Sequence, residues 1–168
     1  GEAAVDALAA NFSGADGWNS GHHYGSEAVF EAVRDYRAKA LVSNGMLDEL
    51  TSETGDKAEA SRILQERAGN WARQYDPNSL IVLRRANARF DVMGEMSAIA
   101  APMLYVLCTT DNLFPTAFGA ERADWFRSHG VEVTYHEVDS PAKHRGPLVD
   151  WEKWSDTLAE FLATLADV

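Results

Sequence analysis

Apolar residues recur at helical spacing through the first part of the chain. From Ser26 onward they return every three to four residues, and this single apolar face predicts a helix capped by that serine. A second helix is predicted after Asp56, because Glu59 follows three residues later as in a capping box. A third is predicted from Asn78, directly after a proline. Together these patterns predict a helical layer over residues 18–95.

The pattern changes after residue 95 and alternates between strand and helix. Residues 103–108 form a continuous apolar run, which is typical of a buried parallel strand. A crossover helix is predicted over residues 116–129, followed by a second strand over residues 131–138. A final helix from Trp151 carries an apolar stripe that we expect to pack on the sheet. This alternation predicts a βαβ unit of the α/β class.

Two strands are too few for a sheet, because they leave unpaired backbone groups along an edge. We therefore expect a missing N-terminal chain to complete the sheet. In this interpretation residues 1–17 are a connector, residues 18–95 the helical layer and residues 96–168 the α/β segment.

Composition argues against several kinds of partner. The chain has 15 Lys and Arg against 26 Asp and Glu, a net charge of −11, without a basic stripe for nucleic acid or anionic lipid. No apolar run is long enough to span a membrane. The single cysteine, Cys108, lies in an apolar strand and is expected to be an inert thiol in a reducing, cytoplasmic compartment. The adjacent pair His22 and His23 has no accompanying cluster of ligands, so no metal site is expected.

An acid and a histidine follow the two predicted strands. Asp111 comes after residues 103–108, and His144 comes after residues 131–138. Loops at the carboxyl ends of parallel strands converge, so the two side chains could form the acid and base of a nucleophilic enzyme. The alternative is that Asp111 only caps a turn and that the histidine is only solvated. A G-x-S-x-G nucleophile elbow, which should precede both residues, is absent from the sequence.

Five segments resemble, in order, the homoserine O-acetyltransferase family, an α/β-hydrolase family that includes deacetylcephalosporin C acetyltransferase. The resemblance implies that residues 18–95 are a helical lid and that residues 96–168 are the last two strands and helices of the fold. It also implies that Asp111 is the catalytic acid and that His144 aligns with the catalytic base. The segments are Trp18-Asn-Ser-Gly-His-His-Tyr24, Tyr75-Asp-Pro-Asn-Ser-Leu80, Arg85-Ala-Asn-Ala-Arg-Phe-Asp91, Ala101-Pro-Met-Leu-Tyr-Val106 and Thr110-Asp-Asn-Leu-Phe-Pro115.

The sequence departs from this family around the histidine. Members typically have Gly-His-Asp there, whereas this chain has Lys143, His144 and Arg145. The missing acid is the residue that contacts the acceptor's ammonium group, and a cation in its place disfavours homoserine. Arg145 could instead bind a carboxylate or face water. Trp18 and Tyr24 could line the acyl or acceptor pocket, or could only pack within the lid.

The leading functional hypothesis is one chain of a processed or split acyltransferase. The resemblance implies that a serine on the N-terminal chain takes an acyl group, with acetyl-CoA or another acyl-CoA as co-substrate and no bound cofactor. His144, oriented by Asp111, would then activate an acceptor hydroxyl. The alternatives are an esterase or other hydrolase of the same fold and a non-catalytic binding module.

Overall fold

A computed structural model describes residues 1–165 of the chain and divides it into two compact units. The helical unit comprises Gly1–Ser43 and Leu47–Asp91. The α/β unit comprises Asn44–Met46 and Val92–Val168. The last three residues of the predicted 96–168 segment lie outside the described residues.

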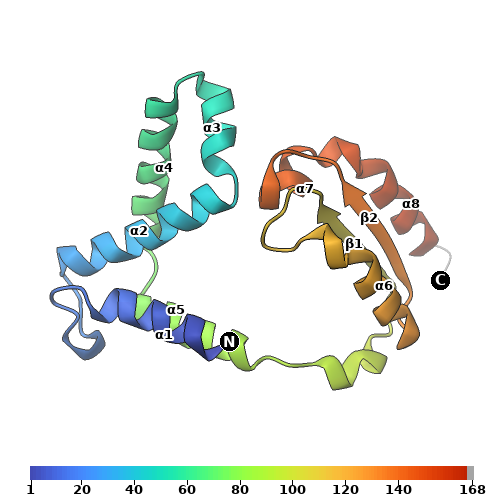
Figure 1. The fold of residues 1–168 in the computed structure, drawn as a ribbon, viewed down its shortest axis with the longest axis horizontal. Helices are drawn as coiled ribbons and strands as arrows, with labels where there is room; N and C mark the ends of the chain where they lie inside the picture. The colour runs from blue at the N-terminus through green and yellow to red at the C-terminus, as the bar shows by residue number, and fades with distance from the viewer. Residues whose placement is uncertain (166–168) are drawn as a thin grey trace. The chain divides into compact units, whose positions relative to one another are not determined.

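Helices packed in pairs form the helical unit (Figure 1). The helix α2 packs against α4, and α1 packs against α5. The apolar core between them includes Leu8, Phe12, Val33 and Ile81. Its elements are α1 (Glu2–Ser13), the 3-10 turn η1 (Asn19–Gly21), α2 (Glu27–Ser43), α3 (Met46–Thr54), α4 (Lys57–Ala72) and α5 (Pro77–Arg89).

Side-chain caps fix the starts of the predicted helices. The Asp56 carboxylate accepts a hydrogen bond from the backbone N–H of Ala58 at 2.8 Å, which satisfies a free donor at the start of α4. The third predicted helix starts one position before Asn78, because Pro77 occupies its first turn and Asp76 is the cap. Proline is well suited to the first turn of a helix, where its missing N–H would have no helical partner.

The amino end of the chain is a helix, whereas the sequence predicted a connector over residues 1–17. The helix α1 buries Val5, Leu8 and Phe12 in the helical unit, and Phe12 is fully buried. Burial of apolar side chains at this spacing stabilises a helix that has no side-chain cap at its start. The start of the helical unit therefore belongs to its core.

Two parallel strands lie at the centre of the α/β unit, as predicted. The strands pair in register from Met103 with Val133 to Cys108 with Val138. Within residues 1–165 these are the only two strands of the sheet. The unit consists of η2 (Met93–Ala98), β1 (Met103–Cys108), η3 (Thr116–Phe118), α6 (Gly119–Ser128), β2 (Val133–Val138), η4 (Lys143–Arg145), α7 (Gly146–Val149), η5 (Trp151–Lys153) and α8 (Ser155–Leu165).

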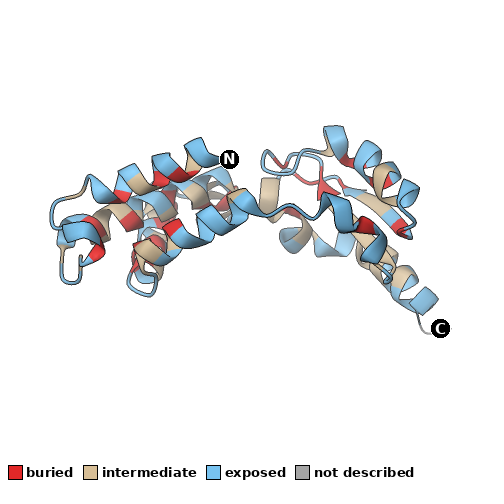
Figure 2. Cartoon of the chain, turned by 90° about the horizontal axis from the view of Figure 1, so that it is seen from below, coloured by how far each residue is buried: buried red, intermediate tan, exposed pale blue. Residues whose placement is uncertain are grey.

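Two helices of the α/β unit differ from their predicted extent. The crossover is a 3-10 turn followed by α6 from Gly119, where an added Cβ would overlap the Tyr135 ring. The final helix is also divided. Its part α8 contacts β2, as expected, with Oγ1 of Thr157 3.4 Å from Nδ1 of His136, but it has no buried residue (Figure 2). Neither α8 nor any other helix within residues 1–165 is long and apolar enough to cross a membrane.

Candidate active site

Asp111 is held at the end of β1 by a turn that its own side chain caps. Its Oδ1 atom accepts hydrogen bonds from the backbone N–H groups of Leu113 at 2.7 Å and Phe114 at 3.2 Å. The residue is only 7 % exposed. Asp111 therefore caps a turn through Oδ1, and this cap leaves Oδ2 available for a second partner.

The second partner is His144. Its Nδ1 atom lies 2.9 Å from Oδ2 of Asp111, across 33 residues of sequence. Because a carboxylate can only accept, Nδ1 carries the hydrogen, and Nε2 of the neutral ring is then the basic nitrogen. The His144 side chain is 38 % exposed and lies beside the Phe114 ring, with 5.6 Å between ring centroids. The pair thus has the geometry of an acid that orients a base.

The Asp111 carboxyl has a pKa below its ordinary value. Burial alone would raise this pKa, because it disfavours the charged form. The hydrogen bond to His144 and the backbone N–H groups of the capped turn outweigh burial and lower the pKa. The carboxylate is consequently ionised at neutral pH, as an orienting acid must be.

Lys143, directly before His144, adopts a backbone conformation that favours glycine. Its φ is +56°, in the left-handed region where a Cβ is crowded by neighbouring backbone atoms. Glycine adopts this conformation freely, whereas lysine carries a strain cost in it.

We expect the variant Lys143→Gly to be more stable than Lys143→Ala by about 1 kcal/mol, because only glycine adopts a positive φ without strain. Both variants remove the lysine side chain, so their difference isolates the backbone effect. The measurement is the free energy of unfolding from urea denaturation. Equal stability of the two variants would contradict the proposed strain.

Cys108 is buried, as predicted, and contacts residues 139–146, the loop that carries His144 and is called the histidine loop below. The residue is 1 % exposed, and its thiol donates a hydrogen bond to the backbone oxygen of Ser140 at 3.4 Å. Gly146 packs so closely on Cys108 and Ser140 that a Cβ there would overlap both. Sequence reasoning missed Ser140 and Gly146, and a glycine one residue beyond Arg145 was the signal available for a close approach.

The predicted pocket residues are divided between the two units. Trp18 and Tyr24 lie in the helical unit, whereas Arg145 is half-buried in the α/β unit beside His144. Trp18 packs against the helical core and stacks on His23, which fits the lid-packing interpretation. Tyr24 is 79 % exposed and lines a hollow of about 390 Å³ on its unit. Their roles in substrate binding stay predictions.

The neighbouring His23 has a protein partner. Its Nε2 atom lies 3.1 Å from Oδ2 of Asp76, the residue that caps α5. The pair connects the loop after α1 to the start of α5, and this contact gives the histidine a structural role. Among residues 1–165 no group of three or more potential ligands could hold a metal ion.

Comparison with curated proteins identifies relatives at about 30 % identity. An L-serine/homoserine O-acetyltransferase of Streptomyces lavendulae is 32 % identical over 67 % of this chain and 33 % of its own length. A serine O-succinyltransferase of Frateuria aurantia is 33 % identical over 61 % of the chain and 30 % of its own length. The resemblance to the homoserine O-acetyltransferase-like family is confirmed. The matched part of the chain spans about a third of the length of these relatives, and no protein-family model matches the chain.

Solved structures agree with this homoserine O-acetyltransferase-like fold. Esterase E22 superimposes with a TM-score of 0.72 at 17 % identity, over 95 % of this chain and 50 % of the esterase. A homoserine O-acetyltransferase from Bacillus anthracis gives a TM-score of 0.69 at 15 % identity, over 94 % of this chain and 48 % of that enzyme. The chain therefore has the fold of about half of an α/β-hydrolase protein.

Proposed function

We propose that the chain is the lid and C-terminal portion of an O-acyltransferase, in which Asp111 and His144 are the acid and base of a catalytic triad. The observation that carries the proposal is the 2.9 Å contact between these two side chains at the carboxyl ends of neighbouring parallel strands. The names of the relatives, which transfer acetyl or succinyl groups to serine or homoserine, support acyl transfer as the reaction.

In the proposed mechanism a serine attacks the thioester carbonyl of an acyl-CoA. Nε2 of His144 takes the serine proton, and Asp111 stabilises the resulting imidazolium through Nδ1. The protonated imidazole then donates this proton to the departing CoA thiolate. After CoA leaves, Nε2 accepts the proton of an acceptor hydroxyl, whose oxygen attacks the acyl-serine and takes the acyl group. The imidazolium then returns this proton to the departing serine oxygen, which regenerates the free serine.

The serine is proposed to lie on a polypeptide segment outside this sequence. The sheet of the α/β unit supports that proposal. Its described part has two strands, and so small a pair leaves backbone groups unpaired along its edges, as expected where further strands pack. We use "assembled enzyme" for this chain together with the segment that supplies the serine.

The assembled enzyme can be tested by intact-mass analysis and by labelling with a fluorophosphonate, which modifies activated serines. We expect a label on a G-x-S-x-G segment that is either a second chain or continuous with this one. Release of CoA from acetyl-CoA and succinyl-CoA should depend on an added hydroxyl acceptor. The acceptors to compare are serine, homoserine and hydroxy acids that lack an ammonium group, because Arg145 stands where the family has an acid.

Hydrolysis is the second candidate, since the same triad can pass the acyl group to water and the fold is also that of esterase E22. Product analysis distinguishes the two functions. Acyl release that is independent of any acceptor would favour hydrolysis. Absence of both reactions in the assembled enzyme, with no labelled serine, would favour a non-catalytic binding module.

A further inference from the structure

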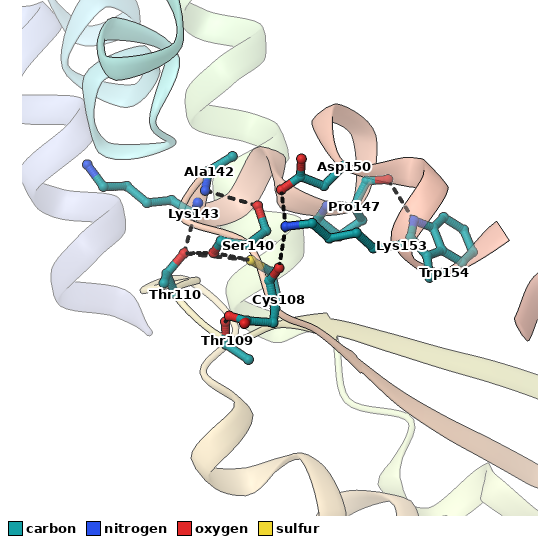
Figure 3. A network of polar contacts seen from close by, with 11 residues as sticks. Cys108, Thr109, Thr110, Ser140, Ala142, Lys143, Pro147, Asp150, Lys153 and Trp154 are labelled. Atoms are coloured by element: carbon teal, nitrogen blue, oxygen red, sulfur yellow. Dashed lines mark hydrogen bonds and ion pairs between the residues drawn. The ribbon is translucent and has the colours of Figure 1, made fainter. Parts of the chain in front are cut away.

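The end of β1 contacts the histidine loop through the side chain of Thr110 (Figure 3). Its hydroxyl Oγ1 donates a hydrogen bond to the backbone oxygen of Ser140 at 2.6 Å. Oγ1 of Thr110 also accepts a hydrogen bond from the backbone N–H of Lys143 at 3.1 Å. One hydroxyl thus contacts the start of the loop and the residue before His144.

Two adjacent residues of the turn after β1 therefore bind two adjacent residues of the histidine loop. Thr110 binds the Lys143 backbone, and Asp111 binds the His144 imidazole at 2.9 Å. Consecutive Cα atoms are about 3.8 Å apart, so the position of one peptide largely fixes where the next side chain begins. The Thr110 contact consequently sets the distance over which His144 must reach Asp111.

The rest of the loop is anchored on either side of Lys143. Ser140 is fully buried, and its Oγ accepts a hydrogen bond from the backbone N–H of Ala142 at 3.1 Å. On the other side, Gly146 packs directly on Cys108. Between these anchors the chain turns at Lys143, whose φ of +56° is costly for a lysine. Thr110 supplies the side-chain hydrogen bond to the backbone at that turn.

We propose that Thr110 is a positioning residue that keeps His144 in register with Asp111. This proposal rests on the proposed function, in which His144 is the catalytic base. The hydroxyl acts on the reaction only through the backbone of the loop, which it contacts at Ser140 and Lys143. Its loss allows the left-handed turn to relax and moves the imidazole away from the geometry that proton transfer needs.

The test compares Thr110→Val with Thr110→Ser in the assembled enzyme. Valine keeps the shape of the side chain but removes the hydroxyl, whereas serine retains it. We expect Thr110→Val to lower kcat by about 10²-fold with little change in KM, since small displacements of catalytic groups have effects of this size. Thr110→Ser should restore most of the turnover.

Thr109→Val is the matched control. Thr109 is the preceding residue, and its hydroxyl donates an exposed hydrogen bond to Oδ1 of Asp139 at 3.3 Å rather than to the backbone around Lys143. We expect this variant to keep the parent's turnover. All variants should first be compared by thermal unfolding, and Thr110→Ala, which also removes the hydroxyl, replaces Thr110→Val in the same comparison if Thr110→Val does not fold.

A spectroscopic measurement tests positioning without relying on acyl transfer. In enzyme labelled with ¹⁵N-histidine, the hydrogen-bonded Nδ1–H signal of His144 should be sharp in the parent, Thr109→Val and Thr110→Ser, and should broaden in Thr110→Val. An unchanged signal and unchanged turnover in Thr110→Val would overturn the positioning role. Equal losses of turnover in Thr110→Ser and Thr110→Val would also overturn the positioning role. Full turnover in His144→Ala would instead overturn the proposed function. In that case the Nδ1–H signal of His144, compared between the parent and the Thr110 variants, would still decide the positioning role.

Discussion

Replacing His144 with alanine in the assembled enzyme should reduce kcat by about 10⁶-fold, which is the scale seen when the base of a serine triad is removed. Without an imidazole, the serine hydroxyl has no group to accept its proton, and the acceptor hydroxyl has none in the second step. Removing the ring also leaves Oδ2 of the buried Asp111 without this partner, so thermal unfolding should first show that the variant is folded. The measurement is steady-state release of CoA in the presence of a hydroxyl acceptor.

The control for this prediction is His129→Ala. His129 is an exposed histidine at the end of α6, where its Nδ1 lies 2.8 Å from the backbone oxygen of Trp125. Its removal should leave kcat within about 2-fold of the parent, as for a surface substitution away from the site. Full turnover by His144→Ala would show that this histidine is not the base.

The second large effect is expected for Asp111→Asn, which should lower kcat by about 10⁴-fold. The asparagine oxygen can still accept from the backbone of the capped turn, which leaves the amide NH₂ facing His144. An NH₂ group cannot accept the Nδ1 hydrogen, so it selects the tautomer with the hydrogen on Nε2. The nitrogen that must accept the serine proton is then already protonated.

Asp124→Asn serves as the control for that variant. Asp124 is exposed on α6 and pairs with Arg127 at 2.7 Å. Exposed pairs of this kind contribute little stability and are remote from the proposed chemistry. Comparable activity of Asp111→Asn and the parent would show that Asp111 is not the acid that orients His144.

The lowered pKa of Asp111 also predicts how stability depends on pH. A carboxyl whose pKa is lower in the folded state stabilises the fold above its unfolded pKa, and this contribution is lost as pH falls through the folded value. Between neutral pH and acid below about pH 4, the parent should therefore lose more stability than Asp111→Asn. Urea midpoints measured across this range check the prediction, and parallel curves would contradict it.

Local patterns predicted most elements because each depends on residues that are close in sequence. The Asp56 cap and the apolar strand over residues 103–108 are found where the sequence placed them. The amino-terminal helix was not predicted, since α1 depends on burying Phe12 against residues far along the chain. The helix α8 could be predicted from its local apolar pattern. That it has no buried residue depends on contacts with distant residues, which a local pattern does not give.

The sequence by itself determined the order strand, acid, helix, strand, histidine, and the resemblance assigned roles to Asp111 and His144. The spacing of apolar residues predicts the order of the strands and the lengths of the loops between them. The convergence of the loops that carry Asp111 and His144 could therefore be inferred. The 2.9 Å contact, the left-handed backbone of Lys143 and the two hydrogen bonds of Thr110 were decided only by tertiary structure. Each of these joins atoms from separate segments, or depends on a dihedral angle that packing imposes, and no local pattern encodes such geometry.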